Sequence, residues 1–409
     1  MIRRTPILIA ASVLLAACGS TPTGQPKTEL TLYNDKGAWS KYFTEMGALS
    51  KQQIGLGMKP VGYTDEPTYQ AFIKASFRTD VKPDLFTWQT GGLLKEIVGQ
   101  KQVAETTAIW QEAIKNGDLS EDVATYYTVD GKQYCVPLNV AYWGMFYNKK
   151  IFDKHGLKPP TTWDELVTVA ETLKKADIKA FYHTSVLFSF VWFEQLLAGT
   201  DPDLYDRLST GKAKYTDPGV VQVMEKWKSL IDAGYFSNPG DKTDPADALK
   251  NDKVAMVSFG TWFNTSMTQR NLDAGFFVIP NVNASLPKTS MIFESGPLCS
   301  LAKAADPAAS MKYLKWWTTT QAQEKWSSAR GDVSANPKVT IKSEVLGQVT
   351  KDAGSGKYRL VNRYFEATPP PILTAALDGF GLFVTKPDSY RQVLEDIQKK
   401  ADEYWSTHQ

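Results

Sequence analysis

The chain has 409 residues, of which 43% are hydrophobic and 22% are charged, and its mean hydropathy is −0.30. This length exceeds what one hydrophobic core usually carries, so about two domains are expected, and the composition is that of an ordinary soluble globular protein. The formal net charge is only +2 and no basic stripe runs along the sequence, which excludes nucleic acid as the expected partner.

Residues 1–17 are predicted to be a signal peptide. Two arginines precede an apolar run from Ile7 to Leu15, which is too short to span a bilayer as a helix. The next residues, Leu-Ala-Ala-Cys ending at Cys18, resemble the bacterial lipobox, in which the cysteine becomes the new N-terminus and carries lipid. We therefore expect lipidation of Cys18 and a flexible tether over residues 18–28, where no large apolar side chain occurs. An ordinary signal peptide with a chance cysteine is the alternative.

Strand-like and helix-like segments alternate after the tether. The predicted strands are residues 29–33, 58–63 and 84–88, and the predicted helices are residues 39–49 and 67–79. Such strand-helix-strand units pair their strands in parallel and form a three-layer α/β lobe. Ligands bind at the carboxyl ends of the strands in sheets of this kind, which is where Asp35, Trp88 and Gln89 fall.

Two cysteines besides Cys18 lie in strand-like segments, QYCVPL with Cys135 and GPLCSL with Cys299. An extracytoplasmic location permits a disulfide between them. Two isolated buried thiols fit the sequence at least as well. The disulfide is therefore a hypothesis that a free-thiol count would test.

The second half of the chain continues the alternation. Thr162 and Glu165 form a capping box that opens a helix through residue 175, and the Asp217-Pro218 pair opens another that ends before Gly234. An Asp-Pro pair at 306–307 predicts one long helix that includes Trp326. Further strands are predicted at residues 254–259, 276–279 and 298–302.

Residues 253–265 form an apolar strand that stops at Gly260 and delivers Trp262 to a loop. An aromatic ring beside a bare glycine backbone is a suitable floor for a flat ligand. On this stretch alone, a core position for Trp262 is the stronger interpretation. Similar aromatic-bearing loops recur, at residues 33–39, 87–92, 142–147, 188–193 and 364–365. We therefore expect the fold to bring these loops together.

The sequence carries no recognisable catalytic or cofactor motif. Its histidines, His155, His183 and His408, are far apart and lack the spacing of metal ligands, so no metal site is expected. No GxSxG elbow, Walker loop or GxGxxG fingerprint occurs. We predict that the protein is not an enzyme and needs no cofactor. A glycosidase pair of carboxylates, such as Glu194 with Glu294, stays open from the sequence.

Several segments, taken in order, resemble the extracellular solute-binding proteins of ABC sugar importers, the group typified by maltose-binding protein. They are LTLYNDKG, PDLFTWQTGG, YCVPLNVAYWGMFYNKKIFDKHGLKPPTTWDEL, LFSFVWFEQLLAG, KVAMVSFGTWFN and LAKAADPAASMKYLKWW. The resemblance covers nearly the whole mature chain and implies a periplasmic-binding-protein type II-like α/β fold. In this fold two lobes are joined by crossing hinge strands and close on a ligand in the cleft between them. The implied lobes are residues 27–138 with 294–342, and residues 139–293 with 343–409.

The resemblance also implies which residues bind the ligand. They are Asp35, Lys36, Trp88, Gln89, Tyr142, Trp192, Glu194, Trp262, Glu294, Ser295, Arg330 and Tyr364. Within this set, Trp262 matches the stacking tryptophan of the family, and Tyr364 or Phe365 matches its last aromatic wall. Gln89 and Thr90 stand where some sugar binders have charged groups, so the pattern of recognised hydroxyls does not carry over.

A sugar presents apolar C–H faces and a rim of hydroxyls, which aromatic planes and planar polar side chains hold well. We expect a monomeric, lipid-anchored protein of the cell envelope, on the periplasmic side or cell surface, that captures a neutral mono-, di- or oligosaccharide by lobe closure. Separate ABC permease subunits in the membrane would receive the sugar. The alternatives are an envelope glycoside hydrolase and a receptor for a charged molecule such as a polyamine or a glycerophosphodiester. A polyamine would use acids such as Asp35, Glu66, Glu194 and Glu294.

Overall fold

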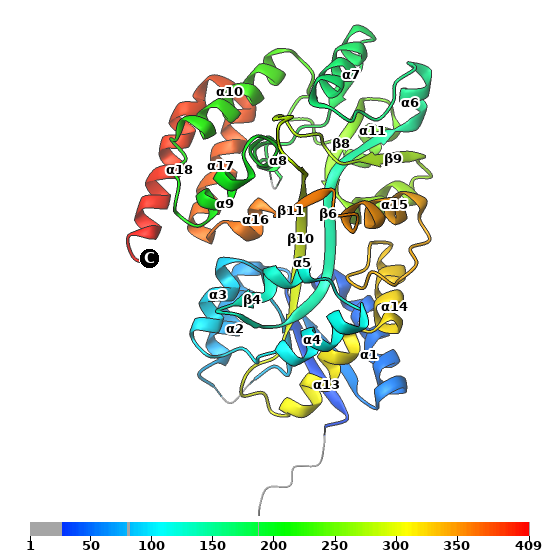
Figure 1. Cartoon of the computed structure of the whole chain (residues 1–409), viewed down its shortest axis with the longest axis vertical. Coiled ribbons are helices and arrows are strands. Elements are labelled where there is room, and N and C mark those ends of the chain that lie inside the picture. The colour runs from blue at the N-terminus through cyan, green and yellow to red at the C-terminus, as the bar shows by residue number, and fades with distance from the viewer. Residues whose placement is uncertain (1–26, 80–81, 187, 409) are drawn as a thin grey trace, which may run out of the picture.

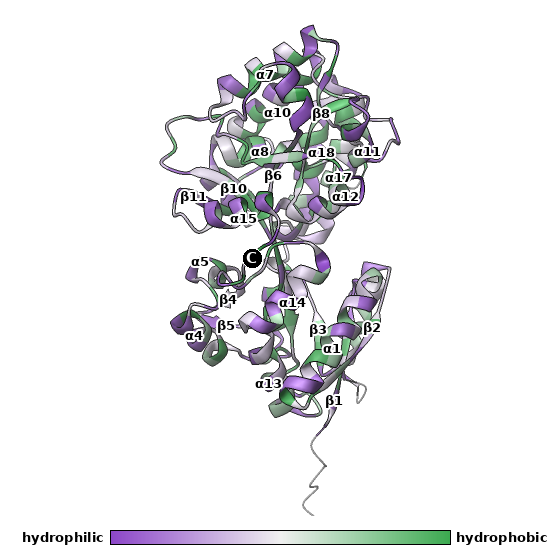
Figure 2. Ribbon diagram, turned by 90° about the vertical axis from the view of Figure 1, so that its right-hand side faces the viewer, coloured by the Kyte–Doolittle hydropathy of each residue, from purple (hydrophilic) through white to green (hydrophobic). Residues whose placement is uncertain are grey.

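The computed structural model describes residues 27–79, 82–186 and 188–408, so the predicted signal peptide, Cys18 and most of the tether lie outside it. The molecule has two lobes joined by a narrow waist (Figures 1 and 2). Strands β6 (Val136–Asn148) and β10 (Thr289–Cys299) run through the waist. The prediction of two α/β lobes joined by crossing strands is therefore confirmed. The residue boundaries predicted for the two lobes stay a prediction.

Within the described residues, one nine-stranded sheet extends through both lobes in the order β2-β1-β3-β10-β6-β8-β7, with β11 beside β10 and β9 beside β6. As predicted, β1 (Glu29–Asn34) pairs in parallel with β2 (Gly57–Gly62) and with β3 (Leu85–Thr87). Strand β10 is antiparallel to both β3 and β6. The prediction of a strand at 298–302 missed most of β10, because that strand begins ten residues before Cys299.

The lower lobe in Figure 1 surrounds β1, β2 and β3 with helices. Its remaining elements are η1 (Gly37–Trp39), α1 (Ser40–Ile54), α2 (Glu66–Ser76), α3 (Gly92–Gly99), α4 (Thr107–Asn116), α5 (Glu121–Ala124), η2 (Thr125–Tyr127), β4 (Thr128–Val129), β5 (Lys132–Gln133), α13 (Pro307–Trp317) and α14 (Thr320–Arg330). The single long helix expected after residue 306 was wrong. The first helix, α13, ends at Trp317, and a second helix, α14, begins at Thr320. The Thr319 hydroxyl caps α14 by accepting a hydrogen bond from the N–H of Ala322.

The upper lobe packs its helices around the other ends of β6 and β10 (Figure 1). Its elements are α6 (Lys149–Lys154), α7 (Trp163–Lys175), β7 (Lys179–Phe181), α8 (Val191–Thr200), α9 (Pro202–Ser209), α10 (Pro218–Asp232), α11 (Pro245–Lys250), β8 (Val254–Gly260), η3 (Thr261–Phe263), α12 (Asn264–Gln269), β9 (Ala274–Phe277), α15 (Glu344–Ala353), β11 (Tyr358–Asn362), α16 (Tyr364–Ala367), α17 (Pro370–Thr385), η4 (Pro387–Ser389) and α18 (Tyr390–Trp405). The capping box that opens α7 is confirmed, because the Thr162 hydroxyl accepts from the Glu165 N–H and the Glu165 carboxylate accepts from the Thr162 N–H. In the part of the chain that the structure covers, no helix is both long enough and apolar enough to cross a bilayer.

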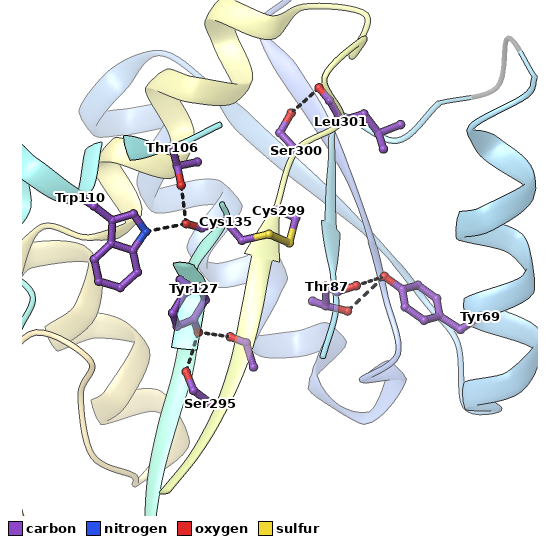
Figure 3. The surroundings of a disulfide bond; sticks show 11 residues. Tyr69, Thr87, Thr106, Trp110, Tyr127, Cys135, Ser295, Cys299, Ser300 and Leu301 are labelled. Carbon is purple, nitrogen blue, oxygen red and sulfur yellow. Dashed lines mark hydrogen bonds between the residues drawn. A yellow bond between two sulfur atoms is a disulfide. The ribbon is translucent and has the colours of Figure 1, made fainter. Parts of the chain in front are cut away.

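A disulfide joins Cys135 to Cys299 at the lower-lobe ends of β6 and β10 (Figure 3), which confirms the hypothesis of a bond. Val136 pairs with Leu298 in the antiparallel ladder. Cys135 precedes Val136 and Cys299 follows Leu298, so the two cysteines face each other. The Thr106 hydroxyl and the Trp110 indole both donate to the carbonyl oxygen of Cys135, at 2.7 and 2.9 Å. The disulfide therefore cross-links the two strands that connect the lobes.

Candidate functional site

A cavity of about 270 Å³, which we call the inner chamber, lies between the two lobes. Its lining residues are Asp35, Lys36, Thr64, Glu66, Gln89, Asn139, Glu294, Gly296, Arg363, Phe365 and Glu366. Asp35, Thr64 and Gln89 follow the ends of β1, β2 and β3, the edge at which parallel sheets bind ligands. The upper lobe contributes the segment around α16. The chamber is therefore shared between the lobes.

Asp35 and Lys36 form an ion pair on the lower-lobe side of the inner chamber, with Nζ of Lys36 3.0 Å from Oδ2 of Asp35. The Thr87 hydroxyl donates to the other carboxylate oxygen at 2.6 Å. Burial opposes ionisation of Asp35, but the attraction of Lys36 and these hydrogen bonds outweigh it and hold the pKa of Asp35 below its usual value. The pair is thus charged and fixed in position.

Glu294 is held from the upper-lobe side by three donors. Its Oε2 accepts from the indole nitrogens of Trp143, at 2.9 Å, and Trp262, at 3.1 Å, and lies 3.1 Å from Nη1 of Arg363. Burial opposes the charge of Glu294, but Arg363 and the two indoles outweigh it and lower the pKa of Glu294. A Cβ at position 260 would lie 2.4 Å from Nε1 of Trp262, so the glycine that ends β8 makes room for this indole.

Arg363 also pairs with Glu366 one turn further along. Its Nε donates to Glu366 at 2.7 Å and its Nη2 makes a second contact with the same carboxylate. Glu66, by contrast, accepts only from amides, those of Gln70 and Gln89, each at 3.1 Å. Burial and the nearby Asp35 raise the pKa of Glu66. No group of three or more histidine, cysteine, aspartate or glutamate side chains in residues 27–79, 82–186 and 188–408 is placed to hold a metal ion.

The family model of the bacterial extracellular solute-binding proteins matches residues 43–353, well over half of the chain. The chain belongs to this family. Its members are extracellular solute-binding proteins, as the resemblance implied.

Relatives of this solute-binding protein agree with that assignment. A multiple sugar-binding protein of Streptococcus mutans is 24% identical, and the match covers 85% of each chain. An uncharacterized ABC transporter extracellular-binding protein of Pyrococcus horikoshii is 28% identical over 68% of this chain and 69% of its own length. The solved structure of the solute receptor AcbH, which has an exclusive substrate preference for β-D-galactopyranose, covers 92% of this chain and 98% of its own. Its TM-score is 0.78 at 21% identity, which shows that the two share a fold.

The structure brings together some of the ligand-binding residues expected for a solute-binding protein. Asp35, Lys36, Gln89 and Glu294 line the inner chamber. Trp262 does not line the chamber itself, but its indole donates a hydrogen bond to Glu294, which does. It stacks on Phe259 with ring centroids 5.5 Å apart.

Other expected site residues do not line the inner chamber, and their part in ligand binding stays a prediction. They are Trp88, Tyr142, Trp192, Glu194, Ser295 and Tyr364, all at most 8% exposed. The Ser295 hydroxyl, for example, bonds to the hydroxyl of Tyr127 inside the lower lobe (Figure 3). Arg330 lies against Trp39, with its guanidinium carbon 3.3 Å from the ring centroid, and does not line the chamber either.

Glu194 is fully buried in α8 and accepts the backbone N–H of Tyr364 at 2.8 Å. Burial raises the pKa of Glu194 well above its usual value. Glu194 does not line the inner chamber, whereas Glu294 does. The chamber therefore does not present to a ligand the carboxylate pair that the sequence left open for a glycoside hydrolase.

The sequence interpretation missed four lining side chains, those of Thr64, Asn139, Arg363 and Glu366. A signal existed for two of them, because Arg363 and Glu366 flank the aromatic pair at 364–365 and lie three residues apart. That spacing places them on one face of a helical turn. The aromatic of the pair that lines the chamber is Phe365, whereas the neighbouring tyrosine packs in the core.

Proposed function

We propose that this solute-binding protein captures a neutral sugar in the inner chamber. The observation that carries the proposal is that both cations of the chamber, Lys36 and Arg363, are already paired with carboxylates. Of the four carboxylates that line it, Asp35 is paired with Lys36, and Glu294 and Glu366 share Arg363. The fourth, Glu66, is bonded to two amides and has a raised pKa. The cavity is rich in hydrogen-bonding groups, and its two cations, Lys36 and Arg363, contact three of its four carboxylates.

A neutral sugar suits this arrangement. Its hydroxyls both donate and accept, so they can bond to carboxylates, amides and the Lys36 ammonium without separating the existing ion pairs. Phe365 offers an aromatic surface for a C–H face, and the guanidinium of Arg363 is 5.3 Å from its ring centroid. The sugar-binding relatives support the same class of ligand.

Charged ligands fit less well. A polyamine needs several carboxylates that lack cationic partners, and a phosphodiester needs free cations. A phosphodiester would have to separate Lys36 from Asp35 or Arg363 from its carboxylates, and among the lining carboxylates a polyamine would find only Glu66 without a cationic partner.

The wider transport role is part of the proposal. Lobe closure around the sugar would present the loaded protein to separate ABC permease subunits, and lipid on Cys18 would keep a monomer at the membrane. The lipobox-like sequence before Cys18 and the name of the Pyrococcus relative support this role.

Isothermal titration calorimetry of a chain that starts at residue 27 tests the proposal with mono-, di- and oligosaccharides, spermidine and glycerophosphocholine. We expect saturable binding of one sugar series and recovery of the sugar intact by chromatography. The Lys36→Met variant should weaken this binding, whereas Lys41→Met, on an exposed residue of α1, should not. Binding of spermidine or glycerophosphocholine alone would overturn the sugar assignment, and recovery of cleaved sugar would establish an enzyme.

A further inference from the structure

A second and larger cavity, about 1090 Å³, lies beside the inner chamber, and we call it the outer chamber. The lower lobe lines it with residues of α2 and α3, and the upper lobe with residues of α9, the start of α17 and the end of α18. Figure 1 shows the C-terminal end of α18 on the same side of the molecule as α2 and α3. The outer chamber is therefore also an interlobe cavity.

The two chambers adjoin at two places. A Cβ at Gly91, which lines the outer chamber, would lie 2.4 Å from the carbonyl oxygen of Glu366, which lines the inner one. Beside that backbone contact, Gln70 of the outer chamber donates to Glu66 of the inner chamber. Gln70 and Glu66 lie one turn apart on α2, and a ligand hydroxyl could replace the Gln70 amide on Glu66 at little cost.

Trp405 gives the outer chamber an aromatic platform. A Cβ at Gly211 would lie 2.6 to 2.8 Å from three atoms of the indole, so one face of the ring packs on bare backbone. Tyr404 meets Trp405 edge to face at 4.8 Å and stacks on His408 at 4.1 Å. The indole is half-buried and held by its neighbours, and it forms part of the cavity lining.

The polar lining of the outer chamber is suited to hydroxyl groups. It includes the amides of Gln70, Gln100 and Asn362, and the buried Oδ1 of Asn362 has no hydrogen-bond partner. Its two acidic residues are already paired, Glu96 with Lys74 and Asp206 with Arg359. Side-chain amides in the lining of a cavity that also holds an aromatic ring are groups to which sugar hydroxyls can bond.

We propose that the outer chamber binds the distal rings of an oligosaccharide whose terminal unit occupies the inner chamber, with Trp405 as the stacking platform. This inference rests on the proposed function and narrows its ligand from any neutral sugar to a chain of three or more rings. The inner chamber is slightly below the usual size of a ligand pocket, whereas the two chambers together exceed it. A short sugar would leave the platform unused.

The test compares nested series of sugars by calorimetry: galactose, melibiose, raffinose and stachyose; maltose to maltotetraose; xylobiose to xylotetraose; and chitobiose to chitotetraose. In the series that binds, the intact protein should bind the tetrasaccharide at least tenfold more tightly than the smallest member. Trp405→Ala should remove about tenfold of affinity for the tetrasaccharide and leave that for the smallest member unchanged. Trp163→Ala, at the start of α7, is the matched control and should change neither value.

A second variant covers the possibility that Trp405→Ala destabilises the fold. Thr210 is exposed and lines the outer chamber, so Thr210→Trp should fill the cavity from the surface and cause the same length-selective loss. Equal affinity for all lengths, unaltered by either variant, would overturn the inference while the sugar-binding function stands. Absence of binding in every series would overturn the proposed function, and the inference with it.

Discussion

The indole nitrogen of Trp262 lies 3.1 Å from Oε2 of Glu294, so an aromatic ring on one side of the waist fixes a carboxylate that lines the inner chamber. The same oxygen accepts from Trp143 and contacts Arg363, so the carboxylate cannot turn without losing several partners. Its position is set by residues that are far apart in the sequence.

Replacement of Trp262 should distinguish its role as a stacked aromatic surface from its role as a hydrogen-bond donor to Glu294. Trp262→Ala removes both the stacked surface and the hydrogen bond, and we expect affinity for the bound sugar to fall tenfold or more, which is about 1.4 kcal/mol or more. Trp262→Phe keeps a ring but not the donor and should lose less. Calorimetry measures both, and circular dichroism should show an intact fold. Unchanged affinity in the alanine variant would assign Trp262 to the core alone.

Gly91 should control how closely the lobes approach. Its φ is +67°, and a Cβ there would meet the carbonyl oxygen of Glu366 across the lobes. Gly91→Ala should therefore cost about 1 kcal/mol of folding stability from backbone strain and also weaken sugar binding, because the lobes are propped apart. The control is Gly131→Ala, with φ of +75° and nothing within 4 Å of the added carbon.

The two glycine variants are compared by urea unfolding and by calorimetry. Both should lose similar stability, but only Gly91→Ala should lose affinity. Equal affinity in the two variants would show that the Gly91 contact is not part of sugar binding.

Asp332 should make stability depend on pH. It is buried, accepts from the Thr261 hydroxyl at 2.8 Å, and has a pKa that burial raises to about 6 despite the nearby Arg330. Between its unfolded pKa near 4 and this value, the native state holds a proton that the unfolded state releases. The free energy of unfolding therefore falls as pH rises through this window, because the buried carboxyl group of Asp332 must ionise. Above about pH 6 this loss of stability is complete.

The Asp332→Asn variant removes this titration. The gain in the free energy of unfolding over the unaltered protein should be larger at pH 8 than at pH 5 by about 1.4 kcal/mol, the equivalent of one pKa unit. Urea titrations at the two pH values measure the difference. A difference that does not change with pH would mean that Asp332 is ionised throughout this range.

The disulfide between Cys135 and Cys299 closes a loop with a sequence separation of 164 residues. Replacing both cysteines by alanine should lower the free energy of unfolding by roughly 2–5 kcal/mol, mainly by freeing the unfolded chain. Sugar affinity should stay unchanged, because neither residue lines a chamber. The denatured, unreduced protein without Cys18 should show no free thiol. Two free thiols would contradict the bond.

The sequence predicts the lobes and most elements well, but it identifies the site less well, because adjacent residues in extended chain face opposite sides. Trp88 and Gln89 belong to one recognisable motif, yet the tryptophan enters the core and the amide lines the inner chamber. Which of two adjacent residues faces the ligand depends on the backbone conformation at the end of the strand. The sequence motif alone does not predict that conformation.

Helix α8 shows a second reason. A helix at the surface reveals its buried face by periodic apolar residues, but α8 is buried along nearly its whole length. Trp192 and Glu194 therefore gave no periodic signal that they point into the core. Arg363 was missed because its partner Glu294 comes from a distant strand, and only the folded chain brings them together.

The order of strands in the sheet has a consequence for biosynthesis. β3 ends at Thr87, but the neighbour that covers its edge, β10, does not begin until Thr289. A ribosome must therefore make most of the polypeptide before the lower lobe can close its sheet, and such long-range pairing is slow. In a chain exported through the predicted signal peptide, such a delay would keep the nascent protein in a translocation-competent state. Folding would then finish in the oxidising compartment where Cys135 and Cys299 can be joined.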